Sequence, residues 1–159
     1  MKKSLLTSLF YFLFSFMPLF LGTSSAIARG VDPWPWSTRM PFPWENIQGT
    51  WTERNSQFTF SFKVVNNTQG EKHILIKQLD PSTGAVVSQG IGFENSEKVV
   101  VAGMTSGDNG QFRMTVRALK NVYSWGTQEF TGVTIESFDG DLLFHFEIRK
   151  INDLPLTDS

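Results

Sequence analysis

Regular alternation of large apolar and polar residues is the feature that most limits what this chain can fold into. It runs through QFTFSFKV (57–64), QFRMTVRAL (111–119) and LLFHFEIRKI (142–151). In each stretch every second side chain is apolar, which is the period of a strand with one buried and one solvated face. Burying one phenylalanine stabilises a fold by roughly 1.5–3 kcal/mol, so several on one face decide which face turns inward. The phenylalanines predicted to face the interior are Phe58, Phe60, Phe62, Phe112, Phe144 and Phe146.

Turn sequences separate these stretches from further predicted strands. NNTQGE, DPSTG, SGDNG and Asp139-Gly140 supply positive φ or local side-chain turns, and the last is typical of a tight hairpin. The other strands are expected at about 49–54, 72–79, 85–93, 97–104, 121–127 and 130–138. Eight or nine strands joined by short hairpins predict an all-β fold, an antiparallel meander closing into a barrel of about eight strands. A two-layer sandwich is the alternative.

The N-terminus predicts export. Lys2 and Lys3 precede an apolar run, and Ala26-Ile27-Ala28 forms a small-x-small site, so we expect a signal peptide over 1–28 cleaved after Ala28. An uncleaved anchor is the alternative. The expected location is periplasmic or secreted, in a bacterium, with no stable membrane insertion after cleavage. The chain then divides into a Trp/Pro-rich strap (29–43), a barrel domain (44–152) and a C-terminal tail (153–159).

Composition and motifs exclude several classes of function. The chain has no cysteine, which rules out disulfides, thiolate metal sites and cysteine nucleophiles. Loss of Lys2 and Lys3 changes the formal net charge from −1 to −3, so nucleic acid is not an expected partner. No sequence motif of a hydrolase, a zinc peptidase or a phosphate loop occurs. His73, His145 and Glu147 are interpreted as polar residues on a solvated sheet face, not as a metal site. We therefore expect no enzyme activity, no cofactor and no metal.

The start and end of the predicted barrel resemble the calycin superfamily, which includes the lipocalins. Gly49-Thr50-Trp51 opens the first strand after PWENIQ, and Arg149 lies near the end of the last strand. In calycins a Gly-x-Trp begins strand one after a short 3₁₀ turn, and a basic residue of the last strand packs over the tryptophan. The resemblance thus implies a structural closure by Gly49, Trp51 and Arg149. Arg149 falls on the face opposite the inward phenylalanines, so Lys150 is the alternative residue over Trp51.

The resemblance also implies a function in binding. An eight-stranded barrel is either filled by its own side chains or holds one small ligand, so the six phenylalanines are candidate contacts for a small apolar ligand. A filled interior with exposed strap tryptophans would instead favour a protein-interaction module.

The strap alternates proline with aromatic residues and is expected to be stiff and extended. Trp44 and Phe42 are predicted to close the end of the barrel where Trp51 lies, whereas Trp34 and Trp36 are candidate contacts for an exported protein partner. A membrane interface is a third candidate for the strap. Exported bacterial inhibitors of metallopeptidases are similar barrels whose N-terminal trunk enters the target, although this chain lacks their cysteine pair.

Overall fold

The computed structural model describes residues 32–155 of the chain. The predicted signal peptide lies outside this range. Nine strands follow one another, and the range contains no helix. The strands are β1 (Thr38–Arg39), β2 (Gly49–Glu53), β3 (Thr59–Asn66), β4 (Lys72–Leu79), β5 (Val86–Glu94), β6 (Val100–Ser106), β7 (Gln111–Tyr123), β8 (Gly126–Ser137) and β9 (Leu142–Asn152).

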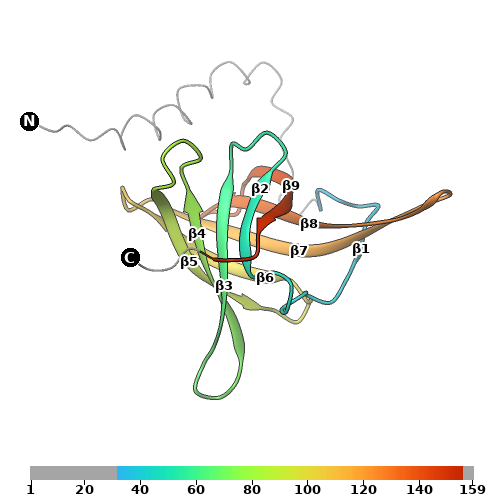
Figure 1. Ribbon diagram of the computed structural model, residues 1–159, viewed down its shortest axis with the longest axis horizontal. Coiled ribbons are helices and arrows are strands. Elements are labelled where there is room, and N and C mark those ends of the chain that lie inside the picture. The colour runs from blue at the N-terminus through green and yellow to red at the C-terminus, as the bar shows by residue number, and fades with distance from the viewer. Residues whose placement is uncertain (1–31, 156–159) are drawn as a thin grey trace, which may run out of the picture.

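Strands β2 to β9 form a closed antiparallel barrel with meander order (Figure 1). Each strand pairs with the next along the chain, and β2 pairs with β9 to close the circle, for example Glu53 opposite Ile148. The predicted all-β meander barrel is therefore confirmed, and the sandwich alternative is wrong. The ninth strand, β1, lies outside the barrel and pairs with β7 through Thr38 and Arg39.

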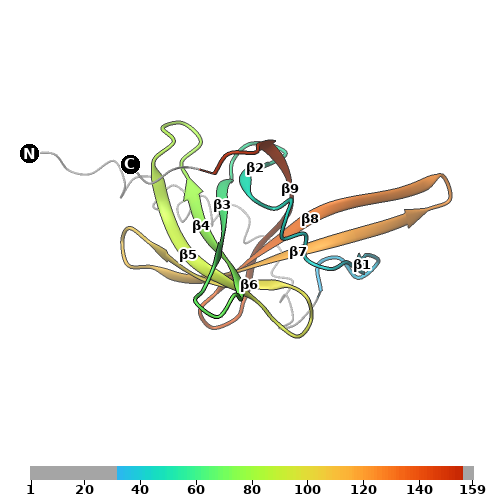
Figure 2. The ribbon, with the colours of Figure 1, turned by 60° about the horizontal axis from the view of Figure 1, so that its bottom comes forward.

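One predicted strand is wrong. The stretch 121–127 is not a strand of its own: β7 runs to Tyr123, Ser124 and Trp125 form the turn, and β8 begins at Gly126. The stretch contains no typical turn pair such as Asn-Gly, so the sequence conceals the hairpin. Figure 2 shows the result, a β7–β8 hairpin that extends well beyond the barrel.

The interior of the barrel is a packed apolar core. Phe60 and Phe62 of β3 have no solvent exposure, and neither do Ile74 and Ile76 of β4. The neighbouring strand β5 has glycines at the positions paired with these isoleucines: Gly90 pairs with Ile76 and Gly92 with Ile74. The core is completed by side chains of the remaining strands, namely Val100, Ala102, Met104, Met114, Val116, Val133, Ile135 and Ile148.

Candidate functional site: the aromatic mouth of the barrel

One end of the barrel is closed by the segment that precedes β2. The backbone turns there, with Asn46 N and Ile47 N both donating to Pro43 O at 2.9 Å. Ile47, at the end of this turn, lies in the core with no solvent exposure, and Phe42, just before the turn, is only 5% exposed. Trp44 packs edge-on against Phe42, with ring centroids 4.9 Å apart. Phe42 and Trp44 thus lie where the sequence places them.

Trp51 completes this closed end, but its basic neighbour is Lys150. The indole Nε1 donates to Ile47 O at 2.7 Å, and Lys150 Nζ lies 5.6 Å from the ring centroid. Arg149 instead pairs with Thr52 and points outward. The expected closure by Arg149 is therefore wrong, because the β9 alternation continues in phase as far as Lys150. Gly49 is required here: its φ is +131°, and a Cβ would overlap the Asn152 carbonyl oxygen.

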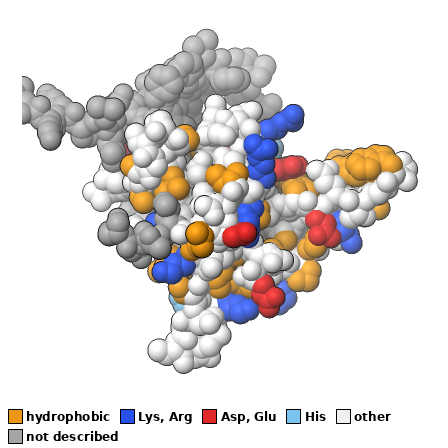
Figure 3. Space-filling view, viewed as in Figure 1, with side chains coloured by type: hydrophobic (Ala, Val, Ile, Leu, Met, Phe, Trp, Pro, Cys, Tyr) orange, Lys and Arg blue, Asp and Glu red, His pale blue; other side chains and the backbone are white. Residues whose placement is uncertain are grey.

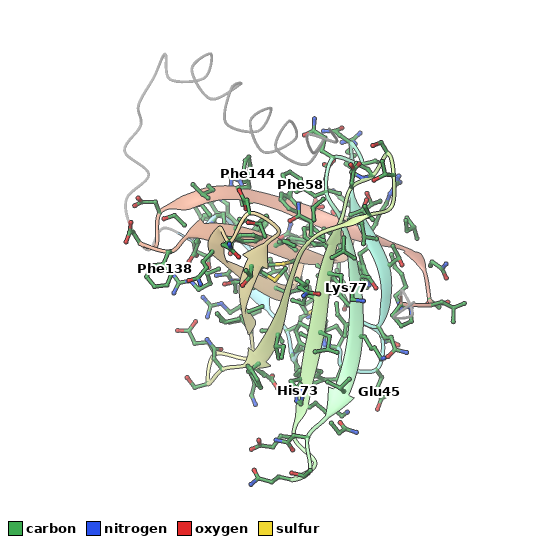
Figure 4. All side chains as sticks on the ribbon, turned by 90° about the vertical axis from the view of Figure 1, so that its left-hand side faces the viewer. Glu45, Phe58, His73, Lys77, Phe138 and Phe144 are labelled. Carbon is green, nitrogen blue, oxygen red and sulfur yellow. The ribbon has the colours of Figure 1, made fainter. Side chains whose placement is uncertain are left out.

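The opposite end of the barrel, which we call the mouth, is lined by partly exposed phenylalanines (Figure 4). Phe58 stacks on Phe146 with ring centroids 4.7 Å apart and packs against Phe144 at 5.4 Å. Phe144 is 40% exposed although its neighbours along β9 show that it faces the barrel axis. Phe112, from β7, is partly buried against the same core.

The wall across from these rings carries polar groups. Gln78, Ser88 and Ser106 follow one another across β4, β5 and β6, in register with Phe60. Ser88 Oγ donates to Gln78 Oε1 at 2.8 Å, and Ser106 Oγ lies 3.1 Å from Gly110 O. Both serines are buried, so the partly exposed polar group opposite the aromatic side is the amide of Gln78.

The six phenylalanines predicted as ligand contacts separate into two levels. Phe60 and Phe62 form a stack 6.1 Å apart in the closed core, with no surface left for a ligand. The other four, Phe58, Phe112, Phe144 and Phe146, surround the mouth. Burial therefore restricts the candidate site to the upper level.

The two candidate partner residues of the strap, Trp34 and Trp36, lie in different environments. Trp34 lies on the outer face of its own barrel, edge-on to Phe130 (6.3 Å) and His145 (5.8 Å). It covers Gly132, where a Cβ would come within 2.9 Å of the indole. Trp36 is 92% exposed. Trp34 therefore packs on the barrel, whereas Trp36 is accessible to solvent.

An arginine lies on the same outer face. Arg117 Nη1 donates to Thr134 Oγ1 at 3.0 Å, while its Nε is buried without a partner among the described residues. Burial lowers the pKa of Arg117 from its usual range, and the charge of Asp32 opposes that shift. Arg39 joins Asp32 (3.6 Å) to Glu97 (2.7 Å), which ties the strap to the β5–β6 turn.

Two exposed aromatic residues were not predicted as functional. Tyr123 and Trp125 stack on each other at the tip of the β7–β8 hairpin, with centroids 4.7 Å apart and planes within 3°. The sequence signal available for them was the uncharged run NVYSWGTQ, which the expected strand 121–127 concealed.

Residues 32–155 contain neither a cluster of three metal-ligating side chains nor a helix long and apolar enough to span a membrane. His73 and His145 lie on β4 and β9, which are separated by β3 and β2. Comparison of the chain with protein-family models, curated proteins and solved structures found no match.

Proposed function

We propose that this protein is an exported, lipocalin-like binding protein whose mouth receives the apolar part of a small ligand. The observation that carries the proposal is the asymmetry of the barrel ends. Phe42 and Ile47 close one end, whereas Phe144 remains 40% exposed at the other while facing inward. An inward-facing aromatic ring with accessible surface is a contact that a ligand can use.

The two walls of the mouth indicate the chemistry of the ligand. The rings of Phe58, Phe144 and Phe146 favour an aromatic or aliphatic group. Gln78, which is only partly buried and accepts a hydrogen bond from Ser88, favours a hydroxyl or carbonyl on the same molecule. The proposed ligand is thus amphipathic, and it binds at the rim because the core below is filled.

Titration with the apolar dye N-phenyl-1-naphthylamine tests this site. The full chain is expressed with its own export signal, and the exported product is purified. Phe144→Ala should weaken dye binding roughly tenfold or more, because it removes an aromatic contact. Phe93→Ala is the matched control: Phe93 is 58% exposed on β5, and its β6 partner Val101 is out of phase with the inward Val100 and Ala102. Absence of dye binding by the wild type, or equal loss in both variants, contradicts the proposal.

A second candidate function is supported by Trp36. Its 92% exposure on a proline-stiffened strap suits a protein-interaction module or an inhibitor-like barrel. Native mass spectrometry of the protein purified from its own cell envelope separates the two candidates. A co-purified small molecule that Phe144→Ala releases supports the mouth, whereas a polypeptide that Trp36→Ala releases supports the strap.

A further inference from the structure

The β7–β8 hairpin continues past its neighbours in the barrel. Strand β6 pairs with β7 only as far as Val116, and β9 pairs with β8 only from Thr131. Beyond these points the two strands pair with each other up to Tyr123 and Gly126, with support from β1 at Leu119 and Lys120. We call residues 117–130 the arm; Figures 1 and 2 show it extending from the barrel.

The end of the arm is uncharged and exposes three large hydrophobic side chains. The run 121–128, NVYSWGTQ, contains no acidic or basic residue. Val122 is 71% exposed, Trp125 76% and Tyr123 40%. Figure 3 shows hydrophobic side chains gathered at this end of the arm.

A third aromatic side chain is held beside the arm. Ser37 Oγ donates to Asn121 Oδ1, which places the backbone of the neighbouring Trp36 close to the hairpin. The two most exposed tryptophans of the described chain, Trp36 and Trp125, therefore belong to one region. Exposed aromatic groups gathered in this way are typical of a surface that binds another protein or a membrane.

Of these two partners, the geometry favours a lipid surface over a protein. A stable protein interface takes about 20–30 residues from each partner, whereas the uncharged end of the arm has eight residues, 121–128. Tryptophan and tyrosine are enriched at membrane–water interfaces, where an amphipathic ring meets both the acyl chains and the headgroups. Because a two-stranded hairpin leaves its outer backbone groups unpaired, the arm suits contact at the hydrated headgroup level and not entry into the acyl chains.

The dimensions agree with shallow contact. From the Asn121–Gln128 pair to the turn the arm extends about 10 Å, and interfacial segments enter a bilayer by roughly 5–10 Å. Lys120 and Glu129 form the next pair toward the barrel and limit deeper entry. We propose that the end of the arm, with Trp36, is a peripheral membrane-docking element that places its aromatic rings among lipid headgroups.

Co-sedimentation with phosphatidylcholine vesicles tests the proposal on the exported product of the full chain. Trp125→Ser should reduce vesicle binding roughly tenfold. Phe138→Ser is the matched control, because Phe138 is 81% exposed in the β8–β9 turn at the opposite end of the barrel, and it should leave binding unchanged. Residues that precede the barrel are common to all variants, so the comparison isolates the arm. Both replaced side chains are exposed, so thermal unfolding should be unaffected.

Salt and bromine give two further readouts. Because the end of the arm is uncharged, binding should change little between about 0.05 M and about 0.5 M sodium chloride. Phosphatidylcholine brominated on its acyl chains should quench tryptophan emission of the wild type, and Trp125→Phe should lose part of that quenching.

Three outcomes overturn the proposal: no vesicle binding by the wild type, equal loss in Trp125→Ser and Phe138→Ser, or a dimer seen by light scattering that Trp125→Ser dissociates while vesicles have no effect. The last outcome would assign the arm to a second copy of the chain. The proposal is independent of the mouth, since failure of dye binding does not alter any of these measurements.

Discussion

At the scale of single residues, close packing inside the barrel depends on glycines in β5. A Cβ on Gly90 would overlap the backbone oxygen of Gly103 and lie 2.7 Å from Met104 Sδ. A Cβ on Gly92 would lie 2.7 Å from Val100 Cγ1 and 2.9 Å from Ile74 Cγ2. These contacts show that the interior beside β5 is already occupied, which is why we propose a ligand at the mouth and not in the core.

Gly90→Ala tests this packing. We expect a loss of about 1–3 kcal/mol in the free energy of unfolding, because the clash involves backbone that cannot rotate away. Gly103→Ala is the control on the adjacent strand, since a Cβ there meets nothing within 4 Å, and its effect should stay within about 0.5 kcal/mol. Urea unfolding of both variants measures the difference, and similar stabilities would show that the core is not tightly packed at β5.

At the scale of elements, the strap and the arm are the parts that depart from a simple barrel. The strap inserts Phe42 into the closed end, lays Trp34 on the outer face and exposes Trp36. Its prolines predicted an extended segment, but proline fixes only φ and not which ring finds a complementary surface. The sequence predicted the docking of Phe42 and Trp44 through the lipocalin resemblance and left Trp34 and Trp36 alike, because their difference depends on Gly132 and Phe130, about 100 residues later.

Two substitutions in the strap should therefore differ strongly. Phe42→Ala removes a ring that is 5% exposed and should cost about 3–5 kcal/mol of unfolding free energy. Trp36→Ala removes a side chain that is 92% exposed and should change stability by no more than about 0.5 kcal/mol. Thermal and urea unfolding followed by circular dichroism measure both. A large loss in Trp36→Ala would mean that the strap packs more extensively than the structure shows.

At the scale of the whole molecule, closure of the sheet was predictable and the difference between its ends was not. Short turns between alternating strands favour a meander, and a meander of this length removes its edges by joining β2 to β9. The alternation likewise identified all six inward phenylalanines. It could not distinguish Phe62 from Phe144, because both occupy inward positions of the same alternating pattern. The segment 42–47 covers only the end of the barrel near Phe62, so Phe62 is buried and Phe144 stays partly exposed.

The two proposed sites should act independently. Phe112 near the mouth and Tyr123 in the arm are eleven residues apart along β7, a separation of about 37 Å. Effects at such a distance are normally additive. Trp125→Ser should therefore leave dye binding unchanged, Phe144→Ala should leave vesicle binding unchanged, and the double variant should show the product of both losses. Coupling beyond twofold in this cycle would contradict two separate sites.

Strands β7 and β8 continue without interruption from the barrel wall into the arm, so the direction of the arm fixes the orientation of the entire domain. In the proposed docking, the mouth with Phe58 and Phe144 would be turned toward the aqueous compartment. A ligand would then enter from the aqueous phase or from another soluble carrier. A lipid of the membrane on which the arm rests would have to leave its leaflet completely before it could reach the mouth.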